Sequence, residues 1–248
     1  MTKTCSAGRA RFGDNPWMRP AALLFDVQGT ATDFFGTVGE ATARIIGDRA
    51  GFDRAEFVNR WRSAYSAALR EPVPESGWRT VHSIYRAGLD ELLGEYGIEL
   101  TEASREELTA SWRELAPWPD TVPGLHRMRE HFVLATLSNA DVSSVVNITA
   151  RGDLPWHAVF TAEMGGAFKP DPACYLLAAR YLGLAPDRIM MVASHKYDIR
   201  AAASLGLRTA FVARPREFGD PALADTEFSD EFDINARDFL DLADQLGA

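Results

Sequence analysis

The 248-residue chain is poor in cysteine and has no long apolar run. Its two cysteines, Cys5 and Cys174, are too few for a disulfide framework and suit a reducing cytoplasm. No apolar stretch approaches the roughly 20 residues that span a bilayer, and residues 1–20 lack the apolar segment of a secretory signal. We therefore expect a cytoplasmic protein that does not contact a membrane.

Positive charge is also scarce. The chain has 26 Lys and Arg residues against 35 Asp and Glu residues, which gives a formal net charge of -9 at pH 7. This balance argues against a general nucleic-acid binder, although a local cation can still hold a small anionic substrate. Hydrophobic residues make up 46% and charged residues 25%, as is usual for globular proteins, and the length allows a core domain with a lid.

The most informative segment is the apolar run Leu23–Phe25, which ends at Asp26. It predicts a buried strand whose carboxyl end presents a carboxylate to a crevice, where ligands collect in open α/β sheets. Gly29 permits a sharp turn and the close approach of a ligand, and Thr30 adds a hydroxyl group. Taken alone, this segment favours a solvated aspartate at a strand end, and the functional interpretation depends on the further segments.

Two later segments also consist of an apolar strand followed by polar residues. The apolar strand predicted at 132–137 ends at Ser138 and Asn139. Another predicted strand, over 188–193, runs into a loop that contains Asp198. Because the carboxyl ends of parallel strands meet at one edge of a sheet, these polar side chains are expected near Asp26.

A further segment supplies a cation. Asp171 followed by Pro172 predicts a helix N-cap and the first residue of the helix. Lys169 therefore lies in the loop just before a helix, within reach of a carboxylate site.

The segment between the first two strands has a helical pattern. Apolar residues recur at three-to-four spacing over 57–69, 81–93 and 108–115, and no strand pattern appears. Pro72, Pro74 and Gly77 separate the first two stretches.

Strands and helices alternate from Gly124 onward. The predicted strands lie near 132–137, 158–161, 188–193, 208–212 and 232–234. This alternation predicts an α/β fold, a doubly wound parallel sheet with helices on both faces.

The predicted domains follow from these patterns. Residues 1–20 are an N-terminal extension, and residues 35–119 form an α-helical cap inserted after the first strand. Residues 21–34 and 120–248 form the α/β core. Such a cap can close over Asp26 and exclude water.

Asp26, Ser138, Lys169 and Asp198 follow one another at four loop ends of the predicted sheet. Their order and context resemble the four motifs of the haloacid dehalogenase superfamily, from about residue 21 to the end of the chain. The first aspartate of that superfamily is a nucleophile. The resemblance therefore implies that Asp26 attacks the substrate.

Two positions differ from the metal-dependent phosphatases of this superfamily. Those enzymes have an acidic residue two positions after the nucleophile, where this chain has Gln28. They also hold Mg²⁺ with an acidic pair whose first position here is Ser194. Gln28 has no proton to give, and Mg²⁺ prefers anionic oxygens. We therefore expect neither a metal nor a cofactor.

The remaining pattern is similar to the type II (S)-2-haloacid dehalogenases. Those enzymes share three short motifs that this chain matches at Trp61-Arg62, at Ser138-Asn139 and from Lys169 to Tyr175. The resemblance implies hydrolysis of short 2-haloalkanoic acids, such as haloacetates and (S)-2-halopropionate, to 2-hydroxy acids through an aspartyl ester. The expected partner is a small anionic haloacid, and related dehalogenases are often homodimers.

The resemblance also implies roles for individual residues. Lys169 would keep Asp26 ionised, since an opposite charge nearby lowers a carboxyl pKa by about 1–3 units. The expected catalytic residues are Asp26, Thr30, Lys169, His195 and Asp198. The expected substrate or halide ligands are Gln28, Arg62, Ser138, Asn139, Tyr175 and Ser194.

Several alternatives stay open at this point. His195 replaces an Asn with which the family positions the attacking water. It could take that role, even as a base, or simply hydrogen-bond the loop. Arg62 could lie on a solvated helix face, and Tyr175 could be core packing. A phosphatase or other superfamily hydrolase, and a catalytically silent relative, are the alternative functions.

Overall fold

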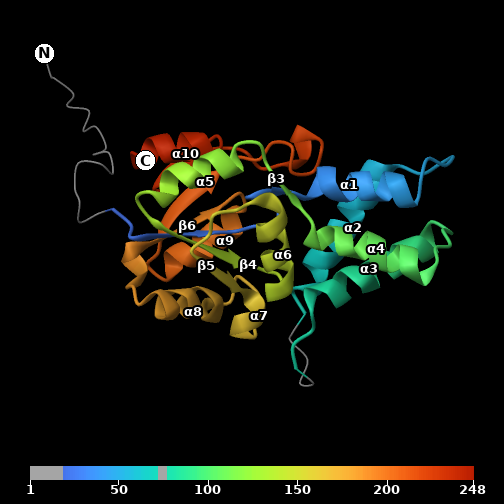
Figure 1. Cartoon of the computed structure of the whole chain (residues 1–248), viewed down its shortest axis with the longest axis horizontal. Coiled ribbons are helices and arrows are strands. Elements are labelled where there is room, and N and C mark those ends of the chain that lie inside the picture. The colour runs from blue at the N-terminus through green and yellow to red at the C-terminus, as the bar shows by residue number, and fades with distance from the viewer. Residues whose placement is uncertain (1–18, 72–76) are drawn as a thin grey trace, which may run out of the picture.

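A six-stranded parallel sheet organises the chain (Figure 1). The computed structural model describes residues 19–71 and 77–248. The strand order is β5-β4-β1-β6-β7-β8, with every neighbouring pair parallel. The strands are β1 (Ala22–Phe25), β4 (Val133–Ser138), β5 (Ala158–Thr161), β6 (Ile189–Ala193), β7 (Arg208–Val212) and β8 (Ile234–Ala236). The predicted α/β sheet is confirmed, with each strand within two residues of its expected position.

The first strand lies in the middle of the sheet. In β1, Leu23 pairs with Leu134 of β4 on one side and with Met190 of β6 on the other. All four residues of β1 are buried. A parallel strand covered on both faces reads as a continuous apolar run, which explains why the sequence pattern located it.

Helices cover both faces of the sheet. α5 packs against α10 on one face, whereas α8 and α9 lie together on the other (Figure 1). The helices of this part are α5 (Thr121–Arg129), α6 (Val142–Gly152), α7 (Ala162–Gly165), α8 (Pro172–Leu182), α9 (Lys196–Ser204) and α10 (Phe239–Leu246). Cys174 of α8 is completely buried, and burial raises the pKa of its thiol to about 12, as fits a core residue.

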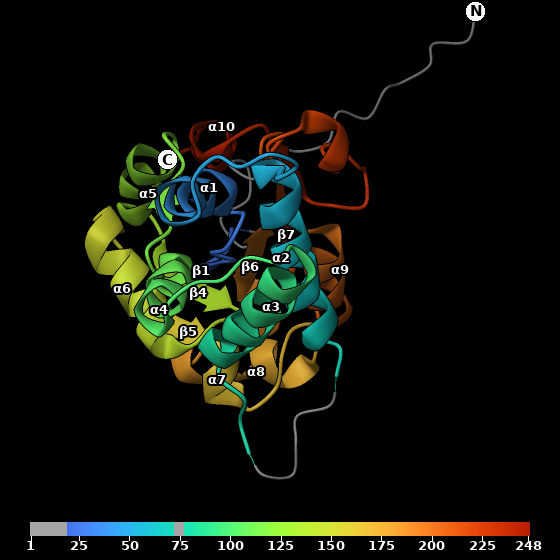
Figure 2. The same ribbon diagram turned by 90° about the vertical axis from the view of Figure 1, so that its right-hand side faces the viewer.

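The segment after β1 is helical, as predicted. It contains α1 (Phe34–Ile45), α2 (Arg54–Ala68), α3 (Val81–Glu95), α4 (Glu102–Ala110) and the short 3-10 helix Ser111–Arg113. Figure 2 shows α2 and α3 in front of the carboxyl ends of β1, β4 and β6. The helical segment thus lies over the edge of the sheet where Asp26 is found.

A short antiparallel ribbon joins the two parts of the chain. β2 (Thr32–Asp33) pairs with β3 (Ala116–Pro117), so the expectation that residues 35–119 contain no strand was wrong. Two residues are too few to leave a strand pattern in the sequence. The ribbon brings the start and the end of the helical segment side by side. The domain boundaries at 34–35 and 119–120 stay a prediction.

Some of the expectations lie outside the described residues, namely those on residues 1–18, including Cys5, and on Pro72 and Pro74. Among the helices that the structure does describe, none is both long and apolar enough to cross a membrane.

Candidate active site

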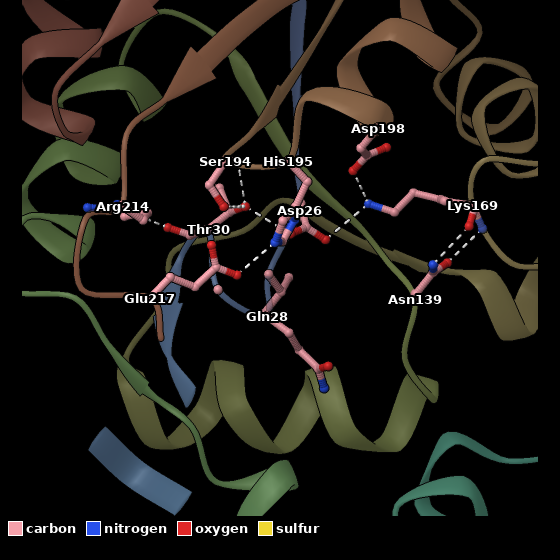
Figure 3. A network of polar contacts seen from close by, with 12 residues as sticks. Asp26, Gln28, Thr30, Asn139, Lys169, Ser194, His195, Asp198, Arg214 and Glu217 are labelled. Carbon is pink, nitrogen blue, oxygen red and sulfur yellow. Dashed lines mark hydrogen bonds and ion pairs between the residues drawn. The ribbon is translucent and has the colours of Figure 1, made fainter. Parts of the chain in front are cut away.

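Asp26 lies directly after β1, where the sheet changes the direction of its connections. Its side chain is 7% exposed. Lys169 donates from Nζ to Oδ1 of Asp26 at 3.0 Å, and Thr30 donates from Oγ1 to Oδ2 at 2.8 Å (Figure 3). Burial opposes the charged form, but Lys169 and His195 outweigh it and hold the pKa of Asp26 well below its usual value. Asp26 is therefore a carboxylate.

Lys169 bridges two carboxylates. Its Nζ donates to Asp198 as well as to Asp26 (Figure 3). The other oxygen of Asp198 accepts a hydrogen bond of 2.7 Å from Tyr175. The expectation that Asp198 lies in a loop was wrong. Asp198 belongs to the first turn of α9, because only Ser194 and His195 separate that helix from β6. Tyr175 thus fixes Asp198, and Asp198 fixes Lys169.

The backbone of Lys169 is also held. Asn139, which follows β4, accepts from the Lys169 N–H at 2.7 Å and donates to its carbonyl at 3.1 Å. The next helix begins as predicted, with Asp171 as N-cap of α8 and Pro172 in the first turn. The Lys169 side chain is 1% exposed, so its ammonium group has a defined place.

Thr30 connects Asp26 to the loop after β6. Its Oγ1 accepts from the backbone N–H of Ser194 at 3.0 Å and lies 3.0 Å from the Ser194 hydroxyl. Since Thr30 gives its own proton to Asp26, the Ser194 hydroxyl acts as donor to Thr30. Ser194 therefore positions Thr30, which in turn orients the carboxylate.

His195 lies between two carboxylates (Figure 3). Its Nδ1 is 3.4 Å from Oδ2 of Asp26, and its Nε2 is 2.7 Å from Oε1 of Glu217. Burial disfavours the imidazolium, but Glu217 and Asp26 outweigh this and hold the pKa of His195 well above its usual value. This place between two carboxylates favours the imidazolium form, and both partners of the ring lie outside its own loop.

Glu217 is a site residue that the sequence analysis missed. It belongs to the loop after β7 and is 4% exposed. A Cβ atom on Gly29, whose φ is +96°, would lie 2.2 Å from Oε1 of Glu217. The loop is held by Arg214, which donates to the Thr30 carbonyl at 2.7 Å and forms two hydrogen bonds with Asp120. The signal available for Glu217 was its place among polar residues after the apolar strand predicted at 208–212.

Arg62 of α2 does not lie on a solvated helix face. It is 9% exposed and donates to Oε1 of Gln28 at 3.0 Å, to the Gln28 carbonyl at 3.4 Å and to the Tyr85 hydroxyl at 2.8 Å. Its guanidinium carbon lies 4.6 Å from the ring centroid of Tyr65 and 4.9 Å from that of Phe34. Within residues 19–71 and 77–248, no carboxylate forms an ion pair with Arg62. The charge is thus buried among aromatic rings and amide groups.

Aromatic residues of the helical segment form the wall behind Arg62. Tyr65 stacks on Tyr85 at 4.5 Å between centroids, and Tyr85 stacks on Trp112 at 4.0 Å. The Tyr85 hydroxyl also donates to Oε1 of Gln28 at 2.9 Å. Tyr65 and Tyr85 belong to the apolar stripes found in the sequence, where spacing could not show that their hydroxyl groups face a site.

A cavity of about 800 Å³ lies between the sheet edge and α2. Seven of the predicted site residues line it, namely Asp26, Gln28, Arg62, Ser138, Asn139, Lys169 and His195. Thr30, Tyr175, Ser194 and Asp198 lie behind these residues and hold them through the contacts described above. The Ser138 hydroxyl is buried and has no hydrogen-bond partner among the described residues. A ligand could supply that partner.

The residues do not fit a Mg²⁺ site. The ammonium group of Lys169 already bridges Asp26 and Asp198, the two carboxylates that a metal would need. In the part of the chain that the structure describes, no three or more His, Cys, Asp and Glu residues are grouped to hold a metal ion. The chemistry at Asp26 therefore has to be derived from side chains.

The described geometry places a buried carboxylate at the carboxyl edge of a parallel sheet, beneath helices. A model of haloacid dehalogenase-like hydrolases matches residues 20–206, and the chain belongs to that family.

Proteins similar to this chain include several haloacid dehalogenases. The L-2-haloacid dehalogenase PA0810 has a structure with a TM-score of 0.85 and 36% identity, covering 92% of this chain and 99% of that one. The defluorinating L-2-haloacid dehalogenase Rha0230 has a TM-score of 0.84 and 34% identity, covering 92% and 96%. The (S)-2-haloacid dehalogenase of Xanthobacter autotrophicus is 27% identical over 196 residues, which are 78% of this chain and 75% of that protein. The predicted family, its dehalogenase branch and the hydrolase class are confirmed.

Proposed function

We propose that this enzyme hydrolyses short 2-haloalkanoic acids to 2-hydroxy acids through an ester on Asp26. The observation that carries the proposal is the pairing, in one cavity, of an ionised buried carboxylate with a buried guanidinium group that has no carboxylate partner among the described residues. A carboxylate can displace a halide, and a free buried cation can receive it.

Asp26 acts first. One of its carboxylate oxygens donates an electron pair to C2 of the haloacid, the carbon–halogen bond breaks, and the halide leaves with the bonding pair. Lys169 and Thr30 hold the carboxylate in one orientation, at 3.0 Å and 2.8 Å, and so reduce the entropy cost of in-line attack. Asn139, Tyr175 and Asp198 act through Lys169, as positioning residues.

Arg62 receives the halide in this proposal. A guanidinium group has five N–H donors, and the contacts described for Arg62 use three. The aromatic rings of Tyr65 and Phe34 exclude water from one side of the group. In such a low-dielectric place a cation stabilises developing negative charge more strongly than it does in water.

Ser138 receives the carboxylate of the haloacid. Its hydroxyl is buried without a partner among the described residues and lines the same cavity as Asp26 and Arg62. A carboxylate oxygen would satisfy that donor, whose burial alone costs about 1–3 kcal/mol. The substrate is then held at its carboxylate while its halogen faces Arg62.

The names of the similar proteins guide the choice of substrates. Those proteins are called (S)-2-haloacid or L-2-haloacid dehalogenases, and one is called defluorinating. We extend the proposal to (S)-2-halopropionate and to chloro-, bromo- and fluoroacetate. The proposal includes two further points. Residues 35–119 act as the cap of this site. The enzyme assembles as a homodimer, which sedimentation equilibrium would test.

The proposal is tested by halide release. The purified enzyme is incubated with each haloacetate and with both enantiomers of 2-chloropropionate, in buffer that contains a chelator. We expect release of halide from the haloacetates and from the S enantiomer, at a rate that the chelator does not change. Strong Mg²⁺-dependent hydrolysis of p-nitrophenyl phosphate, with no halide release, would contradict the proposal.

Replacing the nucleophile gives the matched test. Asp26→Asn should fold like the wild type, since the amide keeps the size of the carboxylate and can still accept from Thr30. It should release no halide because an amide is a poor nucleophile. Thermal unfolding controls for folding. A variant that retains more than a few per cent of the wild-type rate removes Asp26 from this role.

A further inference from the structure

The second half of the reaction needs a water molecule that attacks the ester on Asp26, and this water must lose a proton. Lys169 is a poor acceptor because Asp198, which keeps its carboxylate in the ester, still holds the ammonium group. Asp198 is completely buried, and its two carboxylate oxygens already accept from Lys169 and Tyr175. Neither residue is free to take a proton from water.

His195 is placed to take that proton. Among the described residues that line the cavity, the only carboxylate is Asp26, and the only imidazole is His195. Its Nδ1 lies 3.4 Å from Oδ2 of Asp26, so a water within its reach is also close to the carboxyl carbon of the ester. The His195 side chain is 18% exposed, which leaves one side of the ring open to the cavity.

We propose that His195, paired with Glu217, becomes a base only when Asp26 is esterified. While Asp26 is ionised, His195 is held as an imidazolium. Once Asp26 is esterified, His195 becomes the base that activates water. The inference rests on the proposed function. It adds Glu217 as a positioning residue that orients the ring and stabilises its charge.

The switch follows from the groups that face the ring. They are Asp26 at the end of β1, Glu217 from the loop after β7 and Tyr197 from α9, and Lys169 lies on the far side of Asp26. The carboxylates of Asp26 and Glu217 hold the pKa of His195 well above its usual value against the effect of burial. Esterification removes the charge of Asp26, so that this pKa falls while Glu217 still holds Nε2–H. The proton on Nδ1 leaves to solvent.

The steps balance. Nδ1 of His195 takes a proton from water while the water oxygen forms a bond to the carboxyl carbon of Asp26. The tetrahedral intermediate then breaks its bond to the substrate oxygen, which takes a proton from the imidazolium and leaves as the 2-hydroxy acid. The Asp26 carboxyl group passes its remaining proton to His195, which restores the resting charges. One proton is released to solvent for each halide.

The place of Glu217 is fixed by more than its contact with His195. Oε1 packs so closely on the turn after β1 that a Cβ atom at Gly29 would lie 2.2 Å away. Arg214 ties the same loop to the Thr30 carbonyl at 2.7 Å. The loop that carries Glu217 and the turn that follows Asp26 therefore behave as one unit, which keeps His195 aligned with the ester.

The test separates the two half-reactions in pre-steady-state experiments with chloroacetate in excess over the enzyme. His195→Gln should release one chloride per active site and then stop, and the intact protein should gain the mass of one carboxymethyl group. Glu217→Gln keeps the size of the side chain and a hydrogen-bond acceptor. Its alkylation should stay within about threefold of the wild type, while its ester hydrolysis should slow at least about tenfold.

The pH profile distinguishes positioning from packing. Without the negative charge of Glu217 the imidazole binds its proton less tightly, so the acidic limb of ester hydrolysis should move to lower pH in Glu217→Gln. Glu227→Gln, an exposed neighbour in the same loop region, is the control and should match the wild type.

Three results would overturn the inference: an unchanged profile and rate in Glu217→Gln, full turnover in His195→Gln, or equal loss of both half-reactions in His195→Gln. Wild-type enzyme that releases no halide and forms no ester would contradict the proposed function itself, so that the two failures are distinct.

Discussion

Asp26 and Asp198 both bind Lys169, but their surroundings shift the pKa values of the two carboxyl groups in opposite directions. Asp26 lines the cavity, and Lys169 and His195 together lower its pKa against burial. Asp198 lies behind it, where burial and the charge of Asp26 raise the pKa. Of the two carboxylates, only Asp26 lines the cavity, as the proposed attack on a substrate requires.

Arg62 offers a sharp test at the same scale. Arg62→Lys keeps the charge but loses the planar fork that binds Gln28, Tyr85 and an anion together. We expect kcat/KM for chloroacetate to fall at least about tenfold, which corresponds to ~1.4 kcal/mol of transition-state stabilisation. The loss should lie mainly in kcat, because the halide becomes charged only as its bond breaks.

A neighbouring arginine provides the control for this variant. Arg60 is on the same helix, but its side chain is 41% exposed and pairs with Glu95 at the surface. Arg60→Lys should leave the kinetics unchanged. Arg62→Lys with the kinetics of the wild type would mean that Arg62 does not meet the halide.

At the scale of elements, an aspartate that follows a strand of the sheet holds the start of helix α3. Asp141, which follows β4, accepts from the backbone N–H groups of Val81 and His82 at 2.8 Å and 2.9 Å. These are the first two N–H groups of α3, whose N-cap Thr80 serves the third. Since α3 carries Tyr85 to Gln28 and Arg62, Asp141 links the end of β4 to the proposed halide site.

Asp141→Ala should therefore affect both stability and catalysis. Two N–H groups of α3 would lose their partner, and we expect a loss of about 1–3 kcal/mol in the free energy of unfolding. KM for chloroacetate should rise severalfold because α3 is less firmly held. Urea unfolding and steady-state kinetics measure the two effects.

Asp53→Ala is the matched variant for this prediction. Asp53 caps α2 by accepting from Glu56 at 3.0 Å, and the hydrogen bonds described for it stay at the start of that helix. Its loss should cost about 1 kcal/mol and leave KM unchanged. Equal kinetic effects in the two variants would show that Asp141 acts only as a cap.

The sequence predicted elements better than it predicted contacts. A buried parallel strand such as β1 leaves a continuous apolar run, and the Asp171-Pro172 pair marks a helix start, so both could be located. The ribbon of β2 and β3 has only two residues in each strand and leaves no pattern. Asp198 was predicted in a loop because nothing in the sequence shows that only two residues separate α9 from β6.

Across the whole molecule, the site brings together loops that lie far apart in the sequence. The four aspartate, serine and lysine positions could be found because each ends a recognisable strand or begins a helix. Glu217 also follows a predicted strand, but polar residues after that strand did not single it out, because its role depends on contact with His195 and with the turn at Gly29. The role of Tyr85 could not be predicted either, because helical spacing identifies it only as an apolar position and does not reveal the contacts of its hydroxyl group.

The charge of the site differs from that of the chain. The formal net charge is -9, yet the site combines three cationic side chains with three carboxylates, namely Arg62, Lys169 and His195 with Asp26, Asp198 and Glu217. Because these charges nearly cancel locally, an anionic haloacid is not excluded from a strongly acidic protein.

The central claim is that Asp26 itself bonds to the substrate, and one measurement tests it most directly. A single turnover with chloroacetate is run in H₂¹⁸O with enzyme in excess, and the peptide that contains Asp26 and the glycolate are analysed by mass spectrometry. Because water attacks the carboxyl carbon of the ester, we expect ¹⁸O in the side chain of Asp26 and none in the first glycolate released. Label in that glycolate, with none in Asp26, would show direct attack of water on the haloacid and would contradict the account.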